Sequence, residues 1–359
     1  MDIQARHVLF SHLTAAGLSW ARCEKAKADM GTPVTLGNLI IHKLWGIDYD
    51  KNSEFVDDLH MPDIVYHYTS RDTAVAITDA VIKSVTGDGS DSCGFAFSNY
   101  RFLNDRREYD LGIDFAMDWV PKYNGFPEGL KRQIIEEVAK HKESFAPYVL
   151  SFCQQQDSTS QWQIYTGKEG GYAIGLDVHK LKEEVDRFVG EATGNAERRF
   201  FKKGTAAMFM PCIYWPPEKE WKAKEKFNEN LSEALGRFFD GITDYWWDSK
   251  GKENYHVCAS WCAMRILQFA SFVKSNEFRH EKEWRLVLRP KMVEDKDARI
   301  IAGRPMVTPR TLNLGKCISE IVVSPHGDKD RLRLLAEFQM ARAGISVAMV
   351  ESKSSYSGH

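Results

Sequence analysis

The chain alternates between short apolar runs and longer stretches in which apolar residues recur three or four positions apart. Short runs of this kind predict strands, and the longer pattern predicts helices. The expected strands are residues 63–69, 95–98, 148–153, 171–178, 206–217, 278–290, 319–325 and 345–352. Because these strands do not alternate regularly with helices, we expect an α+β domain on a mixed or antiparallel sheet rather than a doubly wound parallel sheet.

Helical periodicity fills most of the chain between these strands. The expected helices are residues 71–84, 104–120, 129–145 and 329–344, and residues 178–275 are mostly helical apart from one strand. Ser70 is expected to cap the first of these helices, and Gly344 is expected to end the last one in a left-handed conformation.

The pattern also predicts how the chain is divided. Residues 1–60 read as a helical N-terminal segment, and residues 61–353 read as the main α+β domain. Residues 216–275 are expected to be a helical insertion into that domain. The polar residues 354–359 are expected to form a tail that is frayed, as chain ends without packing commonly are.

The composition changes this picture little. Of the 359 residues 43% are hydrophobic and 27% are charged, which is typical of a soluble globular protein. The formal net charge of -2 gives no overall attraction to nucleic acid or to an anionic membrane. The chain has no apolar run of about 18 residues, so no membrane span is expected, and its first residues do not form a signal-peptide pattern.

The seven cysteines are scattered along the chain, which favours reduced thiols and a cytoplasmic location over a disulfide framework. Cys258 and Cys262 lie four residues apart near His256, a spacing that two metal ligands on a helix could have. Their neighbours are apolar in a helical pattern, however, and no second pair of ligands accompanies them. We therefore expect core cysteines and no metal.

The first candidate segment for chemistry is YHYTS, residues 66–70. On a strand, Tyr68 points to one face, and His67 and Thr69 point to the other. An imidazole at a strand end can hydrogen-bond a ligand near neutral pH. The alternative is a buried histidine that is satisfied by a backbone carbonyl.

The second candidate segment is FSNYRFLNDRREYDLG, residues 97–112, which contains Ser98. Asn104 precedes a helical run and can simply cap it. Arg106 and Arg107 stand near the start of the same helix, where cations are slightly unfavourable and an anionic partner would help. Solvated surface arginines are the alternative.

The third candidate segment, residues 151–177, joins two predicted strands through a polar loop and a short helix. Ser160 belongs to a Ser/Thr cluster, and Trp162 and Tyr165 lie three apart on one helical face. These aromatic rings could stack on a planar ligand ring such as nicotinamide or adenine, or they could belong to the core. The segment contains neither nucleotide-binding glycine fingerprint.

The fourth candidate segment is RHEKEWRLVL, residues 279–288. Read as a strand, it places Glu281, Glu283 and Arg285 on one face, and its apolar face carries Trp284, Leu286 and Leu288. Two carboxylates about 6.5–7 Å apart could hold a ribose diol and stabilise a developing cation. The alternatives are an exposed strand face with a cross-strand ion pair, or a helix with an i,i+4 salt bridge.

Six segments in one order resemble an uncharacterised bacterial family over residues 61–353. They read YHYT, FSNYRFLND, SFCQQQDSTSQW, GYAIGL, FRHEKEWRLV and ISEIVVSP. The chain departs from the family pattern after Asn104-Asp105, where a proline usually follows. The order of the motifs is also similar to that of the ADP-ribosyltransferase superfamily, in which a first strand carries His or Arg, a second element carries Tyr or Ser, and a later strand carries a catalytic glutamate.

The resemblance implies an ADP-ribosyltransferase-like split sheet, mixed or antiparallel, with flanking helices and the helical insertion. It implies NAD as a substrate, no metal, Glu283 as the catalytic carboxylate and Glu281 as the outer glutamate of the pair. The implied NAD-binding residues are His67, Tyr68, Thr69, Ser98, Asn104, Ser160, Trp162, Tyr165 and Arg285. Arg285 is also expected to pair with a carboxylate.

The function expected from the resemblance is transfer of ADP-ribose to a macromolecular acceptor, either protein or nucleic acid, as in a bacterial toxin or an anti-phage effector. With water as the acceptor, the same site would make an NAD glycohydrolase. The rival interpretation is a non-catalytic binding or regulatory module on the same fold, with a protein partner bound through the N-terminal helices. No membrane partner is expected.

Overall fold

The computed structural model describes residues 62–86, 94–103, 107–124, 126–143, 145, 147–192, 207–215, 255–288, 297–301, 303–309 and 311–357. The predicted N-terminal helices, most of the predicted insertion and Asn104 lie outside the described residues. The chain divides into two compact units. One contains α6, α11, the 3-10 helix η2 (Val120–Lys122) and α5 from Asp110 onward, and the other contains the main sheet with the remaining described elements. The division into 1–60, 61–353 and 354–359 stays a prediction.

The main sheet is mixed, as the sequence predicts. In the described part of the chain its order is β12-β11-β4-β1-β3-β2-β10-β9, with β8 paired to β3 and β5 paired to β8. Neighbouring strands run antiparallel, except β11 and β12, which are parallel. The strands are β1 (Ile64–Ser70), β2 (Phe97–Asn99), β3 (Tyr148–Cys153), β4 (Gly171–Asp177), β5 (Ala207–Pro211), β8 (Glu283–Leu288), β9 (Ala298–Ile301), β10 (Arg304–Val307), β11 (Ile318–Val323) and β12 (Ala348–Glu351). A separate parallel pair is formed by β6 (Ile213–Trp215) and β7 (Val273–Ser275).

Helices flank this sheet. Those of the sheet unit are α4 (Arg71–Thr86), α7 (Thr159–Tyr165), α8 (Val178–Ala192) and α12 (Lys329–Ala343). The backbone N–H of Thr73 donates to Ser70 Oγ, which supports the predicted cap of α4. Gly344 ends α12 with a φ of 65°, as expected for a left-handed C′ glycine.

The other unit pairs α6 (Glu128–His141) with α11 (Tyr255–Ala270) and adds most of α5 (Glu108–Trp119). Gly112 of α5 lies so close to α11 that a Cβ on it would lie 2.7 Å from the carbonyl oxygen of Ala270. Cys258 and Cys262 are buried in α11 as free thiols. They therefore belong to the core of this unit.

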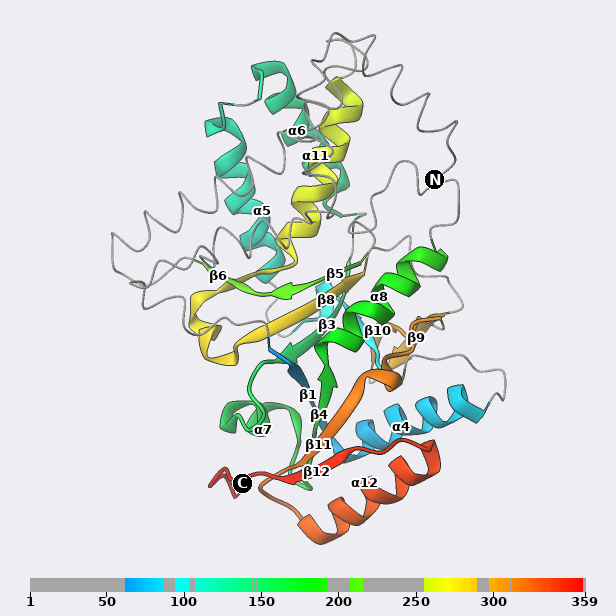
Figure 1. The fold of residues 1–359 in the computed structure, drawn as a ribbon. Helices are drawn as coiled ribbons and strands as arrows, with labels where there is room; N and C mark the ends of the chain where they lie inside the picture. Colours follow the sequence, from blue (N-terminus) through cyan, green and yellow to red (C-terminus); the bar gives the residue numbers. More distant parts are fainter. Residues whose placement is uncertain are drawn as a thin grey trace, which may run out of the picture. The chain divides into compact units, whose positions relative to one another are not determined.

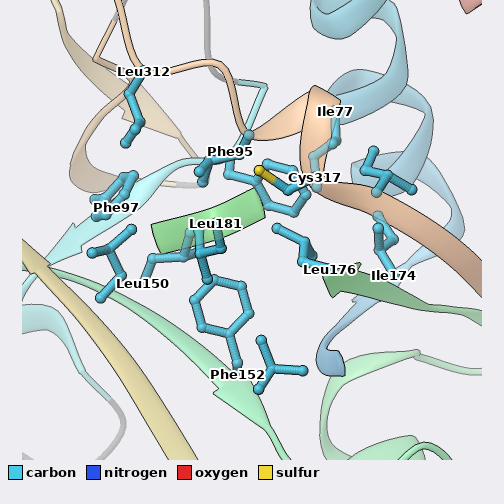
Figure 2. Packing of buried hydrophobic residues seen from close by; sticks show 14 of the residues in the cluster. Ile77, Phe95, Phe97, Leu150, Phe152, Ile174, Leu176, Leu181, Leu312 and Cys317 are labelled. Atoms are coloured by element: carbon cyan, nitrogen blue, oxygen red, sulfur yellow. The ribbon is translucent and has the colours of Figure 1, made fainter. Parts of the chain in front are cut away.

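Both faces of the central strands are buried. On one face Phe95, Leu150, Phe152 and Ile174 pack with Leu181 of α8, as Figure 2 shows. The opposite face carries a second cluster formed by Tyr66, Tyr68, Cys153, Trp162, Ala173 and Val322. Strands that are covered on both sides need apolar residues at successive positions, which explains the continuous apolar runs in the sequence.

The segment 278–288 differs from the predicted single strand. Residues Asn276–Glu281 form the 3-10 helix η5, and β8 begins only at Glu283. Lys282 between them has a φ of 43°, a left-handed conformation that interrupts the strand alternation. Glu281 is therefore not a strand residue. The predicted apolar face is confirmed, because Trp284, Leu286 and Leu288 are all buried.

Candidate functional site

The strands β1, β3 and β8 lie side by side in the sheet (Figure 1). Tyr66 of β1 lies opposite Cys153 of β3, and Cys153 lies opposite Glu283 of β8. Directly opposed residues of antiparallel strands point to the same face of the sheet. The side chains of Tyr66, Cys153 and Glu283 therefore share one face.

Five charged side chains gather beside this row, and we name them the buried charged cluster: Glu108, Lys274, Glu281, Glu283 and Arg285. Lys274 Nζ lies 2.6 Å from Glu281 Oε2, 2.7 Å from Glu283 Oε2 and 3.3 Å from Glu108 Oε1. The exposed fraction of each of the five residues is 7% or less. The predicted alternative of an exposed charged strand face is therefore wrong.

Arg285 is enclosed by hydrogen-bond acceptors. Its Nε donates to Glu283 Oε1 at 2.8 Å, and one terminal nitrogen donates to the carbonyl oxygen of Ser271 at 2.8 Å. The other terminal nitrogen donates to Glu283 Oε2 at 3.0 Å and to Glu108. The prediction that Arg285 pairs with a carboxylate is confirmed. Each of its three nitrogens donates to a protein acceptor, so a role in contacting NAD directly gains no support.

The surroundings keep Glu283 ionised. Burial favours the neutral form of a carboxylic acid, but the charges of Arg285 and Lys274 outweigh it and lower the pKa of Glu283 well below its usual range. Burial likewise opposes the charge of Lys274, yet Glu283 and Glu108 raise the pKa of Lys274 above its usual value. The cluster thus combines three carboxylates with two cations.

Lys274 and Glu108 were missing from the sequence-based candidates. Lys274 lies in the three-residue strand β7, opposite Tyr214 of β6, and Glu108 begins α5. Tyr214 also holds β8, since its hydroxyl accepts from the backbone N–H of Glu283 at 2.7 Å. An isolated lysine or a glutamate at a helix start ordinarily lies in solvent. The signal available in the sequence is that Lys274 follows two apolar residues, Phe272 and Val273. Both of these residues are buried in the structure.

The aromatic pair of α7 separates into two roles. Trp162 is fully buried, donates from Nε1 to Asp157 Oδ1 at 2.6 Å, and packs edge-on against Tyr68. It is a core residue, which was the alternative left open. Tyr165 is 37% exposed. Partial burial, and then the negative charges of Glu281 and Glu283, raise the pKa of Tyr165 to about 12, so its phenol stays protonated at neutral pH.

The loop between β3 and α7 is fastened to residues that follow β12. Asp157 Oδ2 accepts from the backbone N–H groups of Lys353 at 2.6 Å and Ser354 at 3.0 Å. Asp157 Oδ1 accepts from Ser352 Oγ as well as from Trp162. Residues 352–354 are therefore fixed by hydrogen bonds to this loop.

The remaining predicted residues lie within the scaffold, and two of them, Tyr68 and Ser160, make hydrogen bonds within it. The hydroxyl of Tyr68 donates to the carbonyl oxygen of Gln155 and accepts from the N–H of Ser158, both at 2.8 Å. Ser160 Oγ hydrogen-bonds the hydroxyl of Ser158 at 3.1 Å. Thr69 is buried in β1, and Ser98 lies in β2 opposite Val149.

The structure does not bring His67 to the carboxylates. His67 follows Tyr66 on β1, so its side chain points to the opposite face of the sheet from Glu283. Its ring packs edge-on against Phe95 and Phe152, and Nδ1 lies 3.1 Å from the carbonyl oxygen of Ser151. That is the environment of the alternative interpretation, a histidine satisfied by a backbone carbonyl.

This environment predicts a pH dependence of stability. Burial lowers the pKa of His67, and the hydrogen bond to Ser151 offsets this only in part. The unfolded chain therefore binds the proton more readily, and stability falls as the pH drops below about 6.5, by at most about 1.4 kcal/mol per pH unit. In urea titrations at pH 7.5 and pH 5.5, His67→Gln is expected to lose less stability on acidification than the wild type.

The matched control for this prediction is His179→Gln, at an exposed histidine of α8, which is expected to keep the wild-type response to acid. An unchanged response in His67→Gln would show that His67 does not carry the effect.

Among the described residues, no group of three or more His, Cys, Asp or Glu side chains is arranged to hold a metal ion. The described helices are all too short or too polar to cross a membrane.

With this geometry in view, comparison with known proteins adds one finding. Residues 161–286 match a family model described as a protein of unknown function, DUF2971. The matched span contains Tyr165, Lys274, Glu281, Glu283 and Arg285, whereas His67 and Glu108 lie outside it. No match was found among curated proteins or among solved structures.

Proposed function

We propose that the chain is an NAD-consuming ADP-ribosyltransferase with a macromolecular acceptor. The observation that carries this proposal is that the three motif-bearing segments occupy the neighbouring strands β1, β3 and β8 and the loop after β3. At the end of this row lie two glutamates, whose negative charges act on the partly exposed Tyr165. Strand adjacency of this kind is what the resemblance to the ADP-ribosyltransferase superfamily requires.

Cleavage of the bond between ribose and nicotinamide requires little more from the protein than a negative charge held in place. When the bond between ribose C1′ and nicotinamide N1 of NAD breaks, the electron pair leaves with nicotinamide, and C1′ gains oxocarbenium character. An acceptor hydroxyl or amine then bonds to C1′ and releases its proton to solvent. A carboxylate held in place stabilises the positive charge and can bind a ribose hydroxyl, as in glycosidases. Glu283, whose pKa the charges of Arg285 and Lys274 lower, supplies such a carboxylate, and Glu281 lies across Lys274 from it.

Nicotinamide release from NAD tests the proposal. The purified full chain is expected to release nicotinamide, measured by chromatography, and the double variant Glu281→Gln/Glu283→Gln is expected to release none. A wild-type protein that leaves NAD intact in the presence of cell extract, which supplies acceptors, would refute the proposal. Mass spectrometry of the extract distinguishes a protein or nucleic-acid acceptor, which gains ADP-ribose, from water, which yields free ADP-ribose and indicates an NAD glycohydrolase.

A non-catalytic binding or regulatory module is the second candidate, because both oxygens of Glu283 are bonded to Lys274 or Arg285 and His67 points away from them. Thermal unfolding with NAD separates the two candidates. A ligand at 100 times its dissociation constant stabilises the folded state by about 2.7 kcal/mol. Absence of both a thermal shift and nicotinamide release would favour the binding module.

A further inference from the structure

The carboxylate oxygens of the buried charged cluster differ in whether Lys274 or Arg285 contacts them. Both oxygens of Glu283 accept hydrogen bonds from Lys274 or Arg285. Each oxygen of Glu108 contacts one of the same two cations. A carboxylate can accept about four hydrogen bonds, and Glu283 already accepts three. Glu283 is therefore poorly placed to receive a substrate hydroxyl.

Glu281 is different. Its Oε2 accepts from Lys274 at 2.6 Å, whereas Oε1 has no hydrogen-bond partner among the residues that the structure describes. Oε1 is also not among the enclosed polar atoms that lack a partner, so solvent reaches it. Of the three carboxylates in the cluster, Glu281 alone has an oxygen that contacts neither Lys274 nor Arg285.

The backbone around Glu281 is held in place on both sides. Cys153 Sγ donates to the backbone carbonyl of Glu281 at 3.1 Å, and the left-handed Lys282 turns the chain between η5 and β8. Because of that turn, Glu281 and Glu283 both reach Lys274, although they are not alternate residues of one strand. Non-glycine residues held in this conformation cost energy and are concentrated at functional sites.

We propose that Glu281 is the carboxylate that contacts the substrate, and that Glu283 is a positioning residue that holds Lys274 against it. The resemblance to the ADP-ribosyltransferase superfamily implies instead that Glu283 is the catalytic carboxylate. The inference rests on the proposed function and assigns to Glu281 Oε1 the ribose hydroxyl next to the bond that breaks.

The charge of the site supports this assignment. With three carboxylates and two cations, the cluster has one negative charge that no internal cation balances. A group that donates a hydrogen bond or develops a positive charge is therefore attracted to the open oxygen. The charge of Glu281 also helps to raise the pKa of Tyr165, which therefore stays a neutral phenol.

The experiment compares Glu281→Gln with Glu283→Gln by kcat, KM for NAD and thermal midpoint, with rates normalised to the folded fraction. Hydrogen bonds to the ribose that strengthen in the transition state lower kcat when removed and leave KM nearly unchanged. Glu281→Gln keeps an oxygen that can accept from Lys274 but loses the charge of that ion pair, so its thermal midpoint is expected to fall less than that of Glu283→Gln, which loses contacts to both Lys274 and Arg285. Per folded molecule, Glu281→Gln is expected to lose at least about 100-fold in kcat, the scale of one lost transition-state hydrogen bond. Glu283→Gln is expected to lose thermal stability and to lose less in kcat per folded molecule.

The outcomes separate the inference from the function it rests on. A larger kcat loss in Glu283→Gln than in Glu281→Gln would overturn the inference and leave the proposed function intact. An unchanged kcat per folded molecule in Glu283→Gln would show that its role is structural only, which overturns the positioning role. A wild-type protein that neither binds NAD by calorimetry nor releases nicotinamide would overturn both.

Discussion

Arg285→Met is expected to lower the free energy of unfolding by about 3–5 kcal/mol, the cost of breaking a buried ion pair by removing one partner. The methionine fills much of the volume of the guanidinium stem but carries no charge. Glu108 and Glu283 would then remain buried with Lys274 as the one remaining cation of the cluster. Urea unfolding followed by circular dichroism measures the change.

The control for this prediction is Arg333→Met on α12. Arg333 also bridges two carboxylates, Glu337 and Glu351, but all three side chains are about half exposed. Solvent screens such pairs, so the unfolding midpoint should hardly move. Equal destabilisation by the two arginine substitutions would contradict the buried character of the cluster.

Trp162→Ala is expected to destabilise the fold by about 3–5 kcal/mol, the usual cost of removing a large aromatic side chain from a core. The substitution leaves a cavity next to Tyr68 and removes the hydrogen bond from Nε1 to Asp157. Chemical denaturation provides the measurement. The result also bears on function, because a tryptophan that stacked on a ligand ring would cost binding rather than stability.

Ile164→Ala is the matched control, at a residue of the same short helix that is 52% exposed. Surface substitutions of this kind change stability by about 0.5 kcal/mol or less. If Trp162→Ala proved equally mild and weakened NAD binding instead, its assignment to the core would be wrong.

Local sequence patterns predicted the central strands and two helix ends correctly. The apolar runs identified the central strands because those strands are buried on both faces, and Ser70 and Gly344 marked helix ends through rules that depend on one or two neighbours. The 3-10 helix before β8 was missed because it depends on one left-handed residue, Lys282, and a lysine gives no sequence signal for that conformation.

The site was harder to predict, since its composition is set by long-range contacts. The sequence indicated Glu281, Glu283 and Arg285 together, but Lys274 and Glu108 reach them from a two-stranded pair and a helix start. The placement of His67 also depends on long-range contacts. Strand alternation shows that His67 and Tyr66 point to opposite faces of the sheet. Only the pairing of Tyr66 with Cys153, and of Cys153 with Glu283, shows that Glu283 lies on the face of Tyr66.

The hydrogen bonds of Asp157 determine how late during protein synthesis the loop between β3 and α7 can complete its contacts. The loop after β3 leaves the ribosome long before residues 352–354, which donate three of the hydrogen bonds that Asp157 accepts. A nascent chain that lacks residues 352–354 would therefore lack three of the hydrogen bonds that hold the loop before α7, and the contacts of Trp162 with Tyr68 and Asp157 would have to hold this helix.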